Sequence, residues 1–249
     1  LLFMAVALTL GVILVNGWTD APNAIATAVG SGAMPFKRAV WLAAGCNFLG
    51  AAVSCLVFPA VAATMEELVS FARPQDALTA LCAAMLAVVA WATAAWRFGL
   101  PTSESHALLA GLSGGALALG GGSAALNPGA WLRVGLGLVL SLLAGALAGR
   151  MARCFLSRHI CNCIAWQRIA AGVMAALHGV QDGQKFLALL LLADGLGEAE
   201  PSLPLSLLML TAGVMALGTA LGGRPIVEKV GSGLAALSPA DGLAADLGA

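Results

Sequence analysis

Charge is the scarcest feature of this sequence. Only 10% of its 249 residues are Asp, Glu, Lys or Arg, whereas 60% are hydrophobic. Because a soluble domain carries about 25% charged residues, this composition excludes an ordinary soluble domain and favours a chain surrounded by lipid. The 12 basic and 12 acidic residues cancel to a net charge of zero. No excess of positive charge therefore indicates a nucleic-acid partner.

The chain also lacks a metal-binding cysteine pattern. Its six cysteines lie mostly in apolar stretches, where free cysteine commonly behaves as a small buried hydrophobe. Cys161 and Cys163 are the closest pair, and they form too short a cluster for a four-ligand zinc site. No cleavable signal precedes the first apolar segment, and the chain runs from Leu1 to an apolar stretch ending at Ala249. We therefore expect a fragment of a longer protein.

Long apolar runs dominate what is present. A transmembrane helix needs about 20 apolar residues. Such runs occur at residues 1–30, 38–63, 77–97, 100–122, 130–150, 168–193 and 203–222, with an incomplete run near 232–249. The sequence therefore predicts an all-α polytopic membrane protein. The run 100–122 holds Pro101, Glu104 and His106 and ends in three glycines, so it fits either a broken helix or a re-entrant hairpin.

Basic residues indicate which ends of these runs face the cytoplasm, because loops rich in Lys and Arg stay on that side. Lys37 and Arg38 follow the first run, Arg97 ends the third, and four arginines lie between residues 150 and 168. All three places are expected to be cytoplasmic, in a multi-pass protein of the cell membrane. These assignments agree with one another only if the run 100–122 crosses the membrane completely.

Two aspartates interrupt apolar runs at related motifs in the two halves. Residues 16–23 read NGWTDAPN around Asp20, and residues 178–185 read HGVQDGQK around Asp182. With the orientation above, the first run points inward and the second outward, as in transporters built from inverted-topology repeats. The expected division is a first repeat at 1–150, a cytoplasmic linker at 151–167 and a second repeat at 168–249 that is incomplete at its C-terminus.

The two aspartates are expected to bind a cation. A carboxylate in the membrane core is costly, and an intramembrane acid is by default a functional-site hypothesis. The alternative is pairing with a neighbouring helix, but such contacts average only about 0.6 kcal/mol. Asn23 and Thr27 lie on about the same helical face as Asp20. The candidate cation ligands are Asp20, Asn23, Thr27, Glu104, Gln181 and Asp182, with Na⁺ at Asp20 and Asp182; no other cofactor is expected.

The segment 101–106, which reads PTSESH, is the candidate anion site. Exposed N–H groups at a helix start attract anions, and three hydroxyls lie beside them. A helix cap is the alternative, since Ser and Thr are favoured there, but a cap needs neither Glu104 nor His106. Glu104 would repel an anion unless it were protonated or bridged by a cation, so it is also a candidate proton carrier.

Three further polar residues lie near these motifs. Lys185 would neutralise Asp182, attract an anion, or extend to a wet surface. Asn47 interrupts an apolar run, where a lone Asn is more often a contact between helices. His178 opens the second motif and would hydrogen-bond a neighbouring helix or serve the site. We treat Asn47 and His178 as supporting residues.

At these residues the chain resembles the inorganic phosphate transporter (PiT) family of low-affinity phosphate permeases. Residues 16–24 resemble its motif NGxxDxANA, residues 178–185 resemble HGxNDxQK, and residues 101–106 resemble PxSxxH. The resemblance covers nearly the whole chain. The departures are Thr19 and Gln181, where the family often has Asn, Glu104, where it usually has a small hydroxyl, and the lack of a second PxSxxH segment.

The resemblance implies a transporter and not an enzyme: a secondary-active symporter of inorganic phosphate with Na⁺ or H⁺ that works by alternating access. The phosphate-binding residues would be Thr102, Ser103, Ser105, His106 and Lys185. The expected partners are phosphate, the coupling cation and the lipid bilayer, and a homo-oligomer is left open. The alternative is a permease for sulfate or another oxyanion. An intramembrane hydrolase using Ser103 and His106 would need a third orienting group, and a passive channel would need no cation gradient.

Overall fold

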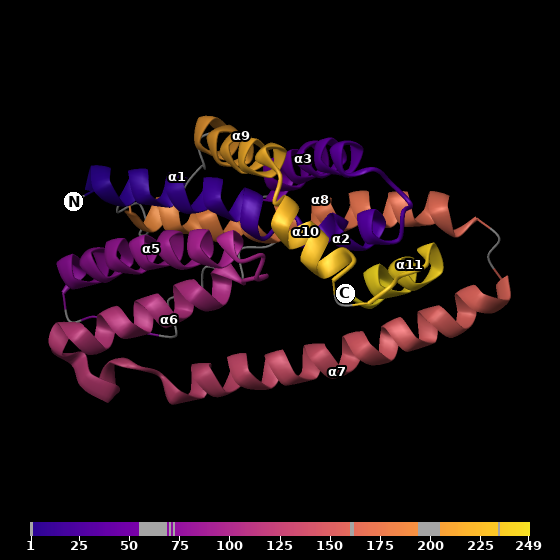
Figure 1. The fold of residues 1–249 in the computed structure, drawn as a ribbon. Helices are drawn as coiled ribbons and strands as arrows, with labels where there is room; N and C mark the ends of the chain where they lie inside the picture. Colours follow the sequence, from indigo (N-terminus) through magenta and orange to yellow (C-terminus); the bar gives the residue numbers. More distant parts are fainter. Residues whose placement is uncertain are drawn as a thin grey trace.

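The computed structural model describes residues 2–54, 69, 71, 73–159, 162–193, 205–233 and 235–249, and these residues are built from helices (Figure 1). The α-helices are α1 (Leu2–Thr19), α2 (Asn23–Gly30), α3 (Phe36–Val53), α5 (Pro74–Arg97), α6 (Glu104–Ala116), α7 (Pro128–His159), α8 (Cys163–Ala193), α9 (Leu205–Leu221), α10 (Arg224–Gly231) and α11 (Pro239–Gly248). A π-helical turn (Leu117–Gly121) and a 3₁₀ turn (Gly122–Ala125) follow α6. The predicted all-α fold is confirmed.

Several helical segments are long and apolar enough to cross a membrane. They are Phe3–Gly30, which joins α1 and α2, Gln75–Arg97 in α5, Pro128–Ser157 in α7 and Cys163–Leu187 in α8. The pair α9 and α10, bent by 66°, qualifies as a fifth if taken as one broken span. The predicted multi-pass architecture with broken helices is therefore present. Part of the expected run 38–63 lies outside the described residues, since α3 is followed only to residue 54.

The run 100–122 is helical from Glu104 to Ala116 in α6 and continues through the π-helical turn to Gly121. At 1.5 Å per residue α6 alone measures about 20 Å, against a hydrocarbon core of about 30 Å. Figure 1 shows α5 and α6 lying side by side as an antiparallel hairpin whose connection points toward α10. Gly99, at φ +64°, makes that turn next to the carbonyl of Pro225. The segment 100–122 therefore supplies the second arm of an α5–α6 helical hairpin.

The segment 151–167, expected to be a linker, is mostly helical. α7 continues to His159 and α8 begins at Cys163. α1 and α8 run in opposite directions through the molecule, as their colours in Figure 1 show. The motif around Asp20 and the motif around Asp182 are therefore carried by helices that run in opposite directions.

α7 is exposed along its apolar length. None of the membrane-span window in α7 is buried, and side chains such as Leu132, Leu140 and Leu142 are more than 60% exposed. Figure 1 shows α7 along one edge of the molecule, where it packs on α11. A helix that is apolar on its exposed faces needs lipid or protein around it, which agrees with the membrane environment expected from composition.

Glycines let α3 and α8 approach until their backbones touch. A Cβ added to Gly50 would lie 2.0 Å from the carbonyl oxygen of Ala176, and one added to Gly179 would lie 2.3 Å from the carbonyl oxygen of Asn47. Small residues commonly permit this kind of close approach in membranes. The contact matters because it sets His178 and Asp182 of α8 against α3 and α1.

Gly50→Ala is therefore expected to destabilise the protein by about 1–3 kcal/mol, as overpacking does. The matched control is Gly45→Ala on the same helix, because a Cβ at Gly45 meets nothing within 4 Å. That control should be neutral or slightly stabilising, since Ala is the better helix former. Thermal unfolding in detergent compares the two variants. Equal melting temperatures would contradict the predicted contact.

Candidate functional site

A helix break places Asp20 between α1 and α2. α1 ends at Thr19 and α2 begins at Asn23. Pro22 has no backbone N–H to continue the helix, while the N–H of Asp20 still reaches the carbonyl of Asn16 at 2.9 Å. The N–H of Asn23 bonds the Asp20 carbonyl at 3.0 Å. The helix is thus interrupted at residues 20–22, within the candidate span Phe3–Gly30, and Asp20 lies at the interruption.

Asp182 of α8 is a buried acid with three polar side chains around its carboxylate. Its side chain is 5% exposed. Lys185 Nζ donates to Asp182 Oδ1 at 2.9 Å, and Asn16 Nδ2 donates to Oδ2 at 2.7 Å. His178 Nε2 lies 3.2 Å from the same Oδ2. Burial of a carboxylate is tolerated when it is paired and hydrogen-bonded in this way.

Glu104, the first residue of α6, joins the same cluster. It is 1% exposed. Its two carboxyl oxygens accept from the hydroxyl of Thr19 and, at 3.2 Å, from Asn16 Nδ2. The Asn16 amide therefore bridges Glu104 and Asp182 and ties the α5–α6 hairpin to α1 and α8.

Asp20, His178 and Asp182 form a group that could hold a cation. One ligand atom from each lies within 4.8 Å of the others. His178 Nε2 is 3.9 Å from Asp20 Oδ2, and Asn23 Nδ2 donates to Asp20 Oδ1 at 3.2 Å. The other ring nitrogen of His178 lies 3.1 Å from Asn47 Oδ1. The Asn47 amide in turn donates to Thr219 at 2.8 Å, so Asn47 orients the histidine from a second layer.

The PTSESH segment is divided between two faces. Ser105 faces the acids, because Lys185 Nζ donates to its hydroxyl at 3.0 Å. Thr102, Ser103 and His106 instead line a groove of about 570 Å³ beside Trp91 of α5. Ser103 also caps α6 weakly, since its hydroxyl accepts from the His106 N–H at 3.5 Å. The expected anion ligands are therefore not all gathered around the acids.

Two expected cation ligands lie away from Asp20. Gln181 is exposed on α8, one residue and so about 100° around the helix from Asp182. Thr27 belongs to another polar cluster with Gln167 and Asp246. The sequence reasoning also missed Asn16, whose amide donates to Glu104 and Asp182. Asn16 lies one helical turn before Asp20 on the same face, and that spacing could have indicated it.

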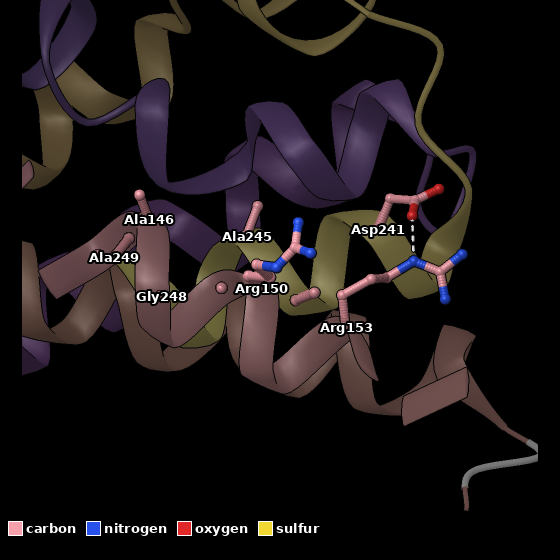
Figure 2. Close-up of a pocket in the computed structure, with 10 residues that line it drawn as sticks. Ala146, Arg150, Arg153, Asp241, Ala245, Gly248 and Ala249 are labelled. Atoms are coloured by element: carbon pink, nitrogen blue, oxygen red, sulfur yellow. Dashed lines mark hydrogen bonds and ion pairs between the residues drawn. The ribbon is translucent and has the colours of Figure 1, made fainter. Parts of the chain in front are cut away.

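A further cavity is separate from the central cluster. Figure 2 shows this cavity, of about 400 Å³, between α7 and α11. Arg153 of α7 pairs there with Asp241 at the start of α11. The Ser238 hydroxyl, and then Arg153, hold the pKa of Asp241 below its usual value. No acid of the central cluster lines this cavity.

A helical fold of several spans, with buried ionisable groups gathered at a helix break, defines a membrane transporter. The sequence matches the family model described as "Phosphate transporter family" over residues 16–167 and 163–249. The chain belongs to that family, which confirms the predicted family and the predicted class of protein, a transporter.

Curated relatives agree over nearly the whole chain. A probable low-affinity inorganic phosphate transporter of Bacillus subtilis is 31% identical over 251 residues, covering 94% of this chain and 72% of that protein. The protein of the same description from Mycobacterium leprae is 28% identical, covering 99% of this chain and 61% of its own length. The chain thus spans about two thirds of these relatives.

A solved structure shares the fold. It is described as the sodium-dependent phosphate transporter and matches 99% of this chain and 82% of its own, with a TM-score of 0.73 at 18% identity. At that identity the likeness concerns the arrangement of helices.

Proposed function

We propose that the chain carries inorganic phosphate across the cell membrane together with a coupling cation, Na⁺ or H⁺, as a secondary-active symporter. Membership of the phosphate transporter family and the names of its relatives support the substrate. The observation that carries the coupling is the meeting of three carboxylates, from Asp20, Glu104 and Asp182, with one buried lysine.

The charges of this cluster explain why a cation is needed. Lys185 offsets one carboxylate, and His178 offsets a second only when it is protonated. An oxyanion approaching such a site meets net negative charge. A cation at Asp20 and Asp182 reduces this negative charge, so that neither solute binds well alone. Coupling of this kind is reciprocal between the two binding sites.

Lys185 and Ser105 are the proposed anion contacts nearest the cation. The lysine ammonium already reaches the serine hydroxyl at 3.0 Å, and both lie by the first turn of α6, whose N–H groups favour negative charge. Thr102, Ser103 and His106 line the neighbouring groove. In this proposal they receive the phosphate as it enters or leaves.

The transport step is proposed to be alternating access between two inverted repeats, residues 1–150 and 168–249. The opposite directions of α1 and α8 and the breaks at Asp20 and between α9 and α10 support it. In inverted-repeat carriers, sites lie near the midplane between repeats, and one repeat moves against the other.

Uptake of labelled phosphate into vesicles that hold the purified protein tests the proposal, with Na⁺ and pH gradients imposed separately. We expect saturable uptake that requires one of the two gradients. Flux without either gradient would indicate a passive channel instead. Complete competition by equimolar sulfate would indicate a broader oxyanion permease.

A further inference from the structure

Two arginines of α7 line the cavity between α7 and α11. Arg150 and Arg153 lie there beside the small residues Gly145, Ala146 and Gly149, which leave room next to the helix. Figure 2 shows both arginine side chains extending from α7 toward α11. Among the described residues that line the cavity, none is a proposed cation or phosphate ligand. The cavity is therefore available for a different ligand.

The cavity carries an excess of positive charge. Asp241 is the only acid among its described lining residues, and both of its carboxyl oxygens are already engaged. Oδ1 accepts from Arg153, and Oδ2 accepts from the Ser238 backbone N–H at 3.1 Å. No ion pair neutralises Arg150 in the described part of the chain, and the sequence of α7 contains neither Asp nor Glu. A ligand of this cavity is therefore expected to be an anion.

Arg150 ends an uncharged stretch of α7 whose length matches the bilayer. The preceding charged residue of the helix is Arg133. At 1.5 Å per residue the two arginines are about 25 Å apart, close to the thickness of about 30 Å of the hydrocarbon core. Arginine near the end of a span extends its charged group toward the lipid headgroups. We therefore expect the cavity to lie at the level of the lipid phosphate groups.

The apolar surface next to Arg150 is uncovered. Leu143 and Leu147 precede Arg150 by about two turns and one turn of α7, so the three side chains lie on neighbouring parts of the helix surface. Leu143 is 65% exposed and Leu147 is 60% exposed. A lipid whose headgroup contacts Arg150 would cover these leucines with its acyl chains. Free inorganic phosphate would leave them uncovered, so the surface favours a lipid.

We propose that the cavity between α7 and α11 binds the headgroup of an anionic phospholipid through Arg150 and Arg153, while the acyl chains lie on the apolar face of α7. Arginine binds phosphate groups through charge-assisted hydrogen bonds, and basic pockets between membrane helices bind anionic lipid headgroups. The bound lipid holds α11 against α7, since both helices line the cavity. The site does not depend on the proposed phosphate transport at the central cluster.

Native mass spectrometry of the purified protein in a neutral detergent tests the site. The anionic probe is phosphatidylglycerol, the zwitterionic probe is phosphatidylcholine, and we expect wild type to bind the anionic lipid more tightly. Arg150→Gln should weaken phosphatidylglycerol binding about fivefold, which corresponds to about 1 kcal/mol for one basic residue near anionic lipid. Arg97→Gln is the matched control, because this exposed arginine ends α5 and does not line the cavity. It should bind like wild type.

A gain of binding keeps the test decisive if Arg150→Gln does not fold. Asp241→Asn removes the negative charge beside Arg153, so it should strengthen phosphatidylglycerol binding about fivefold and leave phosphatidylcholine binding unchanged. An excess of inorganic phosphate should not displace the lipid, because phosphate has no acyl chains to cover Leu143 and Leu147. Equal binding of the two lipids by wild type, undiminished binding in Arg150→Gln, no gain in Asp241→Asn, or displacement by inorganic phosphate would overturn the proposal.

Discussion

Asp182→Asn is expected to abolish concentrative phosphate uptake while the protein still inserts into the membrane. The asparagine is nearly the same size but removes the charge that Lys185, His178 and Asn16 surround. Without that charge the cluster binds a cation only weakly. Phosphate uptake then has no coupled cation to drive it. Asp20→Asn should have the same effect, since it removes the second carboxylate of the cation group.

The measurement is initial uptake of labelled phosphate into vesicles under the gradient that drives wild type, normalised to the amount of inserted protein. Asp76→Asn is the control: this acid lies near the start of α5 and pairs with the exposed Arg73. It should transport like wild type, because exposed ion pairs contribute little. Wild-type uptake by both Asp20→Asn and Asp182→Asn would refute cation coupling at this cluster.

Lys185→Met is expected to impair both folding and transport. Lys185 is 1% exposed, and its ammonium holds Asp182 and Ser105 together. Removing one partner of a buried ion pair leaves the other charge uncompensated and typically costs about 3–5 kcal/mol. Phosphate affinity should also fall, because the proposed anion contact is lost.

A double-variant cycle separates these two effects. Lys185→Met combined with Asp182→Asn removes both charges, so it should be more stable than Lys185→Met alone while still failing to transport. Lys37→Met is the control, because Lys37 is exposed at the start of α3 and should change stability by less than about 0.5 kcal/mol. If the stability losses of the two single variants simply add up in the double variant, Lys185 and Asp182 do not stabilise each other.

The membrane spans, the two functional acids and the family of the protein could be predicted from local sequence patterns. Apolar runs and scarce charge predict spans, because the bilayer demands long apolar helices. Asp20 and Asp182 could be singled out because acids are so costly there. The family followed from motifs that lie close together in the chain.

The partners of these acids could not be predicted in the same way. Glu104 is 85 residues from Thr19, and Asn16 is 166 residues from Asp182. Sequence spacing carries no information on contacts between such distant segments. Thr27 shows the same limit, since the sequence spacing placed it on about the same helical face as Asp20, whereas in the structure its hydroxyl contacts Asp246 and Gln167.

The sequence alone determined the lipid environment, the family and the two acidic breaks, since each depends on composition or on residues within one helical turn. Only the tertiary structure decided that residues 98–103 turn a hairpin, that Ser105 faces the acids while His106 faces a groove, and that Thr27 serves a second cluster. Those outcomes depend on which helices pack together. Glycine contacts help to set that packing: Gly111 and Gly115 of α6 lie against Ala84 and Ala80 of α5, and Gly242 of α11 lies against Gln167 of α8. They fix how closely the helices meet.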